Sequence, residues 1–297
     1  MMEFPISGVE VQWWLPLLFA FGIALLSSVG GLSGAFLLLP FQVSFLGFVG
    51  PAVSPSNLFY NIVSIPSGAY RYWREGRMAW PLAWAIIFGS LPGMLVGALV
   101  RVSYLPDPAH FKPFAGLVLL YIGARLAVDV VRKTSAQPSI RAIGAGGLTN
   151  ESISWTRIEY QFAGKTHRAG TVSIALLSFL VGIVGGAYGI GGGAIVAPFL
   201  VAVYRLPVHS TAGATLFSTL VSSVAGVLIY WGLAQTNLSN GLAVTPDWQL
   251  GGLFGLGGAI GMYLGARLQR YLPTRLIKIV LTVLLLLVAG RYLAGLF

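Results

Sequence analysis

The amino-acid sequence predicts an all-α polytopic membrane protein made of two inverted repeats, each with one broken, re-entrant helical segment and three transmembrane helices. Of the 297 residues, 56% are hydrophobic and only 9% are charged, whereas soluble domains carry about 25% charged residues. Several stretches of about 18 or more residues lack any charge, which is typical of membrane-spanning helices. Glycine-rich interruptions recur at equivalent places in the two halves of the chain.

The internal repeat is the second observation, and repeats are sought first in any long chain. "GGLSGAFLLLPF" (30–41) aligns without gaps with "YGIGGGAIVAPF" (188–199). "SNLFYNIVSIPSGAYRYW" (56–73) falls at the same offset on "ATLFSTLVSSVAGVLIYW" (214–231). Further along, "GMLVGALVRVSYLP" matches "GMYLGARLQRYLP" after extra residues in the second half. The register therefore predicts two homologous halves, residues 11–131 and 170–297.

Each half begins with an apolar segment that is too long for one membrane crossing and is interrupted by glycine. The first half has the broken segment 11–50, followed by predicted spans at 56–73, 81–101 and 113–131. The second half has the broken segment 170–204, followed by spans at 212–233, 249–269 and 275–296. One crossing needs about 20 residues, so each broken segment either crosses with an irregular stretch or enters the membrane and returns.

The positive charges decide between these two topologies. If each broken segment crosses once, the halves run parallel and the 18 Lys and Arg residues divide 11 to 7 between the faces. If each broken segment returns, the halves are inverted, and 15 of the 18 lie on one face, with the other keeping only Arg101, Lys112 and Arg291. Such an asymmetry marks a cytoplasmic face. We therefore expect an inner-membrane protein with both termini outside and residues 132–169 in the cytoplasm.

The polar stretch 132–169 joins the two halves. Within it, "SWTRIEYQFAGKTHR" alternates Ile158, Tyr160 and Phe162 with polar or charged residues and then reaches Ala163-Gly164. This pattern predicts a short β-hairpin. Two interpretations stay open, a covered linker and a regulatory or partner-binding surface.

The net charge of +10 does not indicate nucleic-acid binding, because the basic residues lie in short loops between apolar segments. The chain has no cysteine, which excludes disulfides, thiolate metal sites and cysteine nucleophiles. The N-terminal "MMEFPISGVEVQWW" contains Glu3 and Glu10 but no basic residue, so it does not resemble a cleaved signal peptide.

The two glycine-rich breaks are the best candidates for a binding site. Where a helix stops inside a membrane, its terminal N–H groups need new partners, and with the helix dipole they form an anion site. Glycine allows a ligand to approach the backbone closely. Discontinuous helices in inverted repeats bind substrate in many secondary transporters. The predicted contacts are Ser33, Gly34, Gly191 and Gly192. The alternative is that these glycines only permit tight helix packing.

A polar stripe follows each break. Asn57, Asn61 and Ser64 share one helical face, and their repeat mates are Thr215, Thr219 and Ser222. We predict that Asn57, Asn61, Thr215 and Thr219 hydrogen-bond the oxygen atoms of a solute, with interhelical hydrogen bonding as the alternative. Basic residues near the segment ends are candidates for attracting an anion, with positive-inside anchoring as the alternative; they are Arg71, Arg74, Arg205 and His209.

Several function classes are disfavoured. The central parts of the predicted spans contain no Asp or Glu, although cation pumps and proton relays typically keep buried carboxylates there. This favours an anionic substrate. The sequence contains no recognisable serine–histidine–carboxylate set, metal-ligand cluster or phosphate-binding loop. We therefore expect neither an enzyme nor a cofactor or metal site.

At these residues the chain resembles the TauE/SafE family of sulfite exporters, also called the toluene-sulfonate uptake permease family. The resemblance rests on "GIGGGAIVAPFL" with "VHSTAGATLFSTLVSSVAG", on the weaker first copy "GGLSGAFLLLPF" with "SNLFYNIVSIPSGAYRYWREGRM", on "IGMYLGARL", and on the central basic linker. It implies transport of sulfite, sulfonates or related sulfur-containing anions, either with protons as the coupling ion or as a facilitator. The first copy departs from the second, with Gly-Leu-Ser-Gly-Ala in place of Gly-Ile-Gly-Gly-Gly and Asn57 in place of Thr215.

Together these observations predict a secondary transporter in the lipid bilayer that works by alternating access, with a small sulfur oxyanion between Ser33–Gly34 and Gly191–Gly192. The alternatives are an anion channel, and a carrier of a carboxylate or neutral solute. A homodimer is the candidate assembly, and no nucleic acid is expected as a partner.

Overall fold

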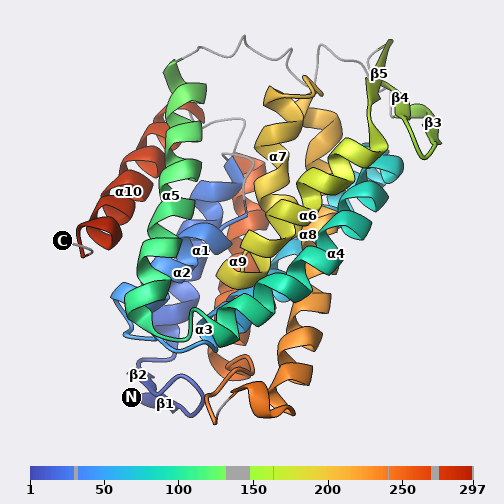
Figure 1. Ribbon diagram of the computed structural model, residues 1–297. Helices are drawn as coiled ribbons and strands as arrows, with labels where there is room; N and C mark the ends of the chain where they lie inside the picture. Colours follow the sequence, from blue (N-terminus) through green and yellow to red (C-terminus); the bar gives the residue numbers. More distant parts are fainter. Residues whose placement is uncertain (30–32, 132–147, 163, 240, 269–273, 296–297) are drawn as a thin grey trace.

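The computed structural model describes residues 1–29, 33–131, 148–162, 164–239, 241–268 and 274–295 (Figure 1). Over these residues the chain is a bundle of ten α-helices with a small sheet at each end. The first half contains α1 (Trp14–Val29), α2 (Ala35–Ser44), α3 (Val53–Arg74), α4 (Trp80–Ser103) and α5 (Pro108–Val131). The second half contains α6 (Thr171–Tyr188), α7 (Gly192–Ala202), α8 (Val208–Ala234), α9 (Trp248–Leu268) and α10 (Thr274–Ala294). The predicted all-α character is therefore confirmed, with small strands added.

The helices follow the segments expected from the sequence. The broken segment 11–50 contains α1 and α2, and the broken segment 170–204 contains α6 and α7. The predicted spans 56–73, 81–101 and 113–131 lie within α3, α4 and α5, and the span 212–233 lies within α8. The spans 249–269 and 275–296 correspond to α9 and α10.

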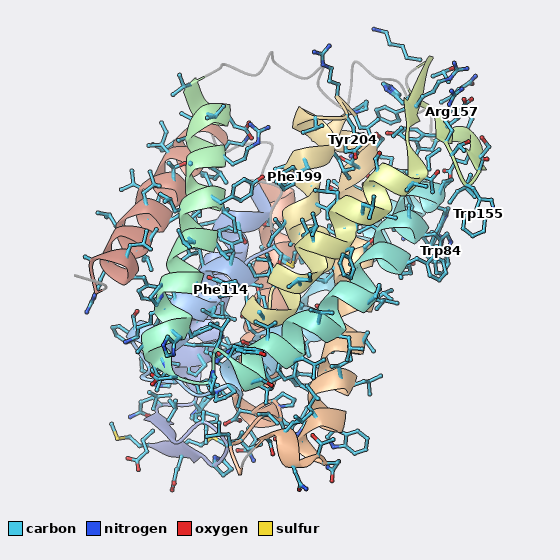
Figure 2. The ribbon with its side chains drawn as sticks, in the orientation of Figure 1. Trp84, Phe114, Trp155, Arg157, Phe199 and Tyr204 are labelled. Atoms are coloured by element: carbon cyan, nitrogen blue, oxygen red, sulfur yellow. The ribbon has the colours of Figure 1, made fainter. Side chains whose placement is uncertain are left out.

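Five of the described helices are long and apolar enough to cross a membrane, namely α4, α5, α6, α8 and α10. Their outward surfaces carry exposed hydrophobic side chains such as Phe88, Leu180 and Leu287, as expected for contact with lipid. Figure 2 shows Trp84 on α4 pointing away from the bundle. The helices α3 and α9 do not reach the same apolar level. In α3 the reason is the stripe of buried polar residues that includes Asn57, Asn61 and Ser64.

Glycine residues of α4 make the closest contact between helices of the two halves. The helices α4 and α6 touch backbone to backbone, because Gly89, Gly93 and Gly97 face α6 at one-turn spacing. A Cβ atom added at Gly93 would lie 2.1 Å from the Phe179 carbonyl oxygen. Small residues permit such close approach in membranes. The residue numbers increase in the same order on both helices, since Gly89 meets Ala175 and Gly97 meets Ile183. The helices α4 and α6 therefore run parallel.

The second half repeats this contact with α9 and α1. Gly257, Gly261 and Gly265 of α9 face α1, and a Cβ atom added at Gly261 would lie 2.4 Å from the Phe21 carbonyl oxygen. These glycines are the repeat mates of those in α4. The two glycine contacts therefore place α4 against α6 and α9 against α1 in the same way.

The central helices cross in the opposite sense. Gly226 of α8 faces Leu58 of α3, and Gly68 of α3 faces Leu216 of α8, so α3 and α8 run antiparallel. The same is true of α5 and α10, because Gly116 faces Tyr292 whereas Gly123 faces Leu285. In these two pairs, helices that are repeat mates of one another thus pack side by side and point in opposite directions.

Two small antiparallel sheets lie at opposite ends of the bundle (Figure 1). Strands β1 (Met2–Phe4) and β2 (Val9–Val11) form an N-terminal hairpin that the sequence did not predict. It is fastened by Ser7, whose amide and hydroxyl donate to Asp247 Oδ2 at 3.0 and 2.8 Å. The other sheet contains β3 (Thr149–Ile153), β4 (Ile158–Phe162) and β5 (Lys165–Ala169). Its β4–β5 hairpin occupies the stretch where the sequence predicts one, with Phe162 paired to Lys165.

Candidate functional site

The helical breaks are the feature around which the candidate site is built. Helix α6 ends at Gly189, which has a left-handed backbone with φ of 91° and whose amide donates to the Gly185 carbonyl at 2.8 Å. Gly191 also has a positive φ of 85°. L-residues other than glycine rarely adopt these conformations. The sequence Gly-Ile-Gly therefore ends one helix and starts the next within three residues.

A helix that ends inside a protein core leaves carbonyl groups without intrahelical partners. Side chains from neighbouring helices supply them here. The Gly186 carbonyl accepts from the Tyr230 hydroxyl at 2.9 Å, and the Ala187 carbonyl accepts from the Ser54 hydroxyl at 2.9 Å. The last turn of α6 is thus capped by side chains from α8 and α3.

Two asparagines of α3 connect the first break with the second. Asn57 Nδ2 donates to the Ala35 carbonyl at 2.9 Å and to the Gly189 carbonyl at 3.0 Å. Asn61 accepts from the Ser33 hydroxyl at 3.0 Å and donates to the Ile190 carbonyl at 2.8 Å. We call this set of residues the break junction; it consists of Ser33, Ala35, Asn57, Asn61, Gly189 and Ile190.

Proline and tyrosine add a further link across the breaks. Pro40 lies inside α2 and has no N–H, so the Phe36 carbonyl one turn earlier loses its helical donor. The Tyr188 hydroxyl, at the end of α6, donates to that carbonyl at 2.9 Å. The second half therefore completes the backbone hydrogen bonding of α2.

The N-terminus of α7 is pressed against α8. The Gly192 amide donates to Ser222 Oγ at 2.9 Å. A Cβ atom added at Gly193 would lie 2.2 Å from the Thr215 carbonyl oxygen and 2.7 Å from Thr219 Oγ1. The threonine hydroxyls themselves donate within α8, that of Thr219 to the Thr215 carbonyl at 2.7 Å. These hydroxyls line the second break but bond their own helix in this conformation.

The structure brings most of the predicted site residues together. Ser33, Asn57 and Asn61 belong to the break junction, and Thr219 lies against Gly191, where an added Cβ would come within 2.9 Å of its methyl group. All eight predicted binding residues are buried, namely Ser33, Gly34, Asn57, Asn61, Gly191, Gly192, Thr215 and Thr219.

The four basic candidates are not brought to the junction. Arg74 and Arg205 are exposed, and Arg74 lies 13 residues beyond Asn61 on α3, which corresponds to roughly 20 Å of helix. The side chains of Arg71, in the last turn of α3, and His209, in the first turn of α8, lie outside the described part of the structure.

Sequence reasoning missed a buried arginine close to the second break. Arg101 is fully buried near the end of α4 and donates to Ser54 Oγ and the Gly50 carbonyl, both at 3.1 Å, and to the Leu105 carbonyl. Its guanidinium also stacks over Phe111 at 3.8 Å. Because Ser54 in turn caps Ala187, one hydroxyl connects this charge to the end of α6. A charged residue inside a predicted span was the available signal.

Some buried polar atoms at the site have no hydrogen-bond partner among the described residues. They include Tyr60 Oη, Ser64 Oγ and Gln42 Oε1. The Tyr60 hydroxyl faces Gly34, where an added Cβ would lie 2.6 Å from it. Unsatisfied buried hydroxyls are uncommon in proteins. The first break therefore carries hydrogen-bonding capacity that the described side chains do not use.

Comparison with known proteins identifies the family. The family model described as Sulfite exporter TauE/SafE matches residues 16–292. The chain is 26% identical over 200 residues, covering 67% of this chain and 65% of the relative, to the probable membrane transporter protein YunE of Bacillus subtilis (strain 168). It is 29% identical over 124 residues to the probable membrane transporter protein YdhB of the same organism, covering 42% of this chain and 46% of YdhB.

A third relative is the probable membrane transporter protein MamO of Magnetospirillum gryphiswaldense (strain DSM 6361 / JCM 21280 / NBRC 15271 / MSR-1). It is 21% identical over 280 residues, covering 86% of this chain and 42% of MamO. The matches thus span 65%, 46% and 42% of the lengths of these three relatives. No solved structure matches the chain significantly. The family model covers nearly the whole sequence, including both breaks and the helices that hold them, and the chain therefore belongs to the TauE/SafE sulfite exporter family.

Proposed function

We propose that this chain is a secondary transporter of sulfur-containing anions, such as sulfite or organosulfonates, and that it binds the anion at the break junction. The observation that carries this proposal is the bridge made by Asn57 and Asn61, each of which contacts both helical breaks. Because both breaks form this site, any movement of one break relative to the other would change the shape of the site. The names of the family and of the three relatives agree with transport.

The chemistry of the junction favours an oxyanion. The first N–H groups of α2 and α7 have no partner within their helices and lie at the positive ends of the helix dipoles. Ser33 and the unpartnered Tyr60 hydroxyl add donors around them, whereas Ser222 Oγ accepts the Gly192 amide in this conformation. The tetrahedral or pyramidal oxygens of a sulfonate or sulfite can accept several such bonds at once. Arg101 contributes positive charge through Ser54 without contacting the junction directly.

In the conformation described, the asparagine amides donate to backbone carbonyls of the breaks. We infer that an arriving anion replaces some of these acceptors, so that Asn57 and Asn61 exchange carbonyl oxygens for anion oxygens. Such an exchange couples substrate binding to the shape of both breaks. It also agrees with the central parts of the predicted spans, which contain no Asp or Glu that would repel an anion.

Alternating access requires two parts of the molecule that can rock about a common site. The antiparallel packing of the repeat mates α3 and α8 supports an inverted arrangement, as does the antiparallel pair α5 and α10. The matched glycine contacts of α4 with α6 and of α9 with α1 support two similar rigid pairs. We propose that these pairs move relative to each other and expose the junction to either side, with α1–α2 and α6–α7 re-entering from opposite faces of an inner membrane.

Flux into proteoliposomes tests the proposed function. We expect saturable uptake of sulfite, taurine or sulfoacetate, less uptake of sulfate and acetate, and a response to a pH gradient if protons are coupled. Asn61→Ala should lower uptake strongly, whereas Asn237→Ala, at an exposed position, should not. Saturable uptake of acetate with no response to any sulfur anion would reject the substrate class. Flux that does not saturate would favour an anion channel.

A further inference from the structure

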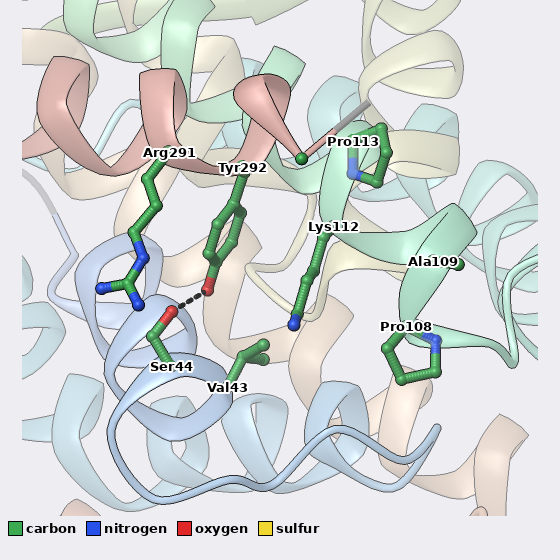
Figure 3. Close-up of a pocket in the computed structure, with 9 residues that line it drawn as sticks. Val43, Ser44, Pro108, Ala109, Lys112, Pro113, Arg291 and Tyr292 are labelled. Carbon is green, nitrogen blue, oxygen red and sulfur yellow. Dashed lines mark hydrogen bonds between the residues drawn. The ribbon is translucent and has the colours of Figure 1, made fainter. Parts of the chain in front are cut away.

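A second cluster of anion-binding groups lies away from the break junction, in a cavity of about 470 Å³ between α2, α5 and α10 (Figure 3). Its walls include Ser44 from the end of α2, Pro108 and Lys112 from the start of α5, and Arg291 and Tyr292 from the end of α10. Small-molecule sites typically have volumes of about 300–1,000 Å³. The cavity is therefore large enough for a small organic anion.

The charges that line this cavity are unusual for their position in the chain. Only Arg101, Lys112 and Arg291 among the 18 Lys and Arg residues fall on the sparsely charged face in the inverted topology. Two of these three line the same cavity. Arg101 is buried, with its guanidinium stacked on Phe111, the residue that precedes Lys112. Two of the three positive charges of this face thus lie at one cavity.

Neither cation has a carboxylate partner among the described residues. The ion pairs there involve Arg77, Arg125, Arg157 and Arg168, and none involves Lys112 or Arg291. Asp107, which precedes α5, uses Oδ1 to accept the Ala109 amide at 2.8 Å. Arg291, in the last turn of α10, also complements the dipole of its helix. That preference explains its location, and among the described residues the guanidinium has no carboxylate partner.

A pair of hydroxyl groups also lines the cavity. Ser44 Oγ lies 2.8 Å from the Tyr292 hydroxyl, and either atom can be the donor (Figure 3). In the view of Figure 3 these two hydroxyls lie between the Arg291 guanidinium and the Lys112 ammonium. The two hydroxyls bond each other, and the Tyr292 hydroxyl also donates to the Pro40 carbonyl at 3.4 Å. The two cations are therefore the main donors for an oxyanion, and charge-assisted hydrogen bonds from Lys and Arg are the strong ones. The cavity also lies at the N-terminal turn of α5, whose dipole favours negative charge.

We propose that this cavity is a second oxyanion site, in which Lys112 and Arg291 bind a sulfonate, sulfite or phosphate group. Helix α2 joins it to the break junction, since Ala35 lies at the junction and Ser44 at the cavity. Nine residues of helix separate them, which corresponds to roughly 14 Å. An anion held in the cavity is therefore close enough to supply the junction. The site itself does not depend on the proposed transport function.

Chemical protection of Lys112 tests this site without measuring transport. The full chain in phosphatidylcholine nanodiscs is treated with an amine-acylating ester, and the modification of each lysine is followed by peptide mass spectrometry. A bound oxyanion blocks the ammonium and holds it protonated, which is the unreactive form. We expect methanesulfonate at about ten times its Kd to slow acylation of Lys112 about tenfold. Lys165, exposed on β5, should not respond.

Two further measurements test the role of Arg291 and identify where the bound oxyanion comes from. Arg291→Gln should raise the methanesulfonate concentration needed for half-protection about tenfold, whereas Arg157→Gln, at an exposed arginine beside β4, should not. Nanodiscs with phosphatidylglycerol show whether a lipid phosphate occupies the site instead; protection by that lipid alone would identify the oxyanion as a headgroup. Absence of protection by both anions, or protection unchanged by Arg291→Gln, would overturn the proposal. If the chain transports no sulfonate but methanesulfonate still protects Lys112, the result would count against the proposed function at the break junction and not against this second site.

Discussion

The side chain of Asn61 makes three hydrogen bonds, two of them with residues of the breaks. Its Nδ2 donates to the Ile190 carbonyl at 2.8 Å and to Ser223 Oγ at 3.3 Å, and its Oδ1 accepts from Ser33. Asn61→Leu keeps the volume but leaves these groups buried without partners. Each such group costs about 1–3 kcal/mol, so we expect a clearly lower midpoint of thermal unfolding in detergent. The matched control is Asn237→Leu at an exposed position; an equal effect of both would show that Asn61 does not hold the breaks together.

Substitution of Gly192 tests whether the close approach of α7 to α4 at the second break is needed. A Cβ atom added there would lie 2.4 Å from Ser90 Cβ and 2.8 Å from Ser90 Oγ on α4. Gly192→Ala should therefore displace α7 and lower both transport and thermal stability. Since the obstacle is a side chain rather than backbone, the double variant Gly192→Ala/Ser90→Gly should recover much of the loss. Gly290→Ala on α10, with open space around it, serves as the control. Failure of Ser90→Gly to rescue would mean that Gly192 is needed for backbone freedom or ligand contact, and not for this packing.

At the scale of single elements, the glycine contacts make a symmetric prediction. An added Cβ at Gly93 would lie 2.1 Å from the Phe179 carbonyl oxygen, and one at Gly261 would lie 2.4 Å from the Phe21 carbonyl oxygen. Both obstacles are backbone, so the helices must separate. We expect Gly93→Ala and Gly261→Ala to lower the midpoint of thermal unfolding to a similar degree. Gly22→Ala, with no atom within 4 Å, should leave it unchanged or raise it slightly, because alanine favours the helix by about 0.5–1 kcal/mol. Harmless substitution in only one half would show that the two contacts are not equivalent.

Tyr160 in the β3–β5 sheet leads us to expect that the thermal stability of the protein falls at high pH. Burial raises the pKa of Tyr160 to about 12, opposed by its hydrogen bond with Ser210. The folded state therefore favours the neutral phenol, whose ordinary pKa is about 10. This contribution is fully present below about pH 10 and is lost as the pH rises through about 12. Thermal stability measured from about pH 9 to about pH 12 should fall less steeply for Tyr160→Phe than for the wild type. Identical pH profiles would show that Tyr160 titrates as it does in the unfolded chain.

The helices could be predicted from the sequence because membrane spans need long uncharged segments and because each half repeats the other. The β4–β5 hairpin could be predicted because Ile158, Tyr160 and Phe162 alternate with polar or charged residues. The β1–β2 hairpin could not be predicted, because its three-residue strands are too short to show a pattern and depend on the distant Asp247. At the site, the stripe on α3 pointed to Asn57 and Asn61. Tyr188 and Tyr230 carry no such signal, since their partners are carbonyl groups that only the folded breaks expose.

At the scale of the whole molecule, glycine contacts and repeat symmetry indicate how motion and binding are combined. The pairs α4–α6 and α9–α1 each join one helix from each half through backbone contact, so neither half can move as an isolated unit. For the transport mechanism that we propose, we expect relative movement where α3 crosses α8 and where the breaks meet. The asparagines that bridge the breaks lie on α3. In that proposal, anion binding at the junction and rearrangement of the bundle therefore involve the same helix.

The topology of the chain can be tested directly, because the natural sequence has no cysteine. Single cysteines are placed at exposed positions by Glu3→Cys in the N-terminal hairpin, Ser152→Cys in β3 and Ala294→Cys at the end of α10. If the broken segments re-enter, each half crosses the membrane an odd number of times, and the 15 basic residues of one face lie in the cytoplasm. A membrane-impermeant maleimide added to intact cells should then label the Glu3→Cys and Ala294→Cys variants and leave the Ser152→Cys variant unmodified until the membrane is opened. Parallel halves would instead place all three positions on one side, since each half would cross an even number of times, and labelling of all three variants from the same side would reject the inverted repeat.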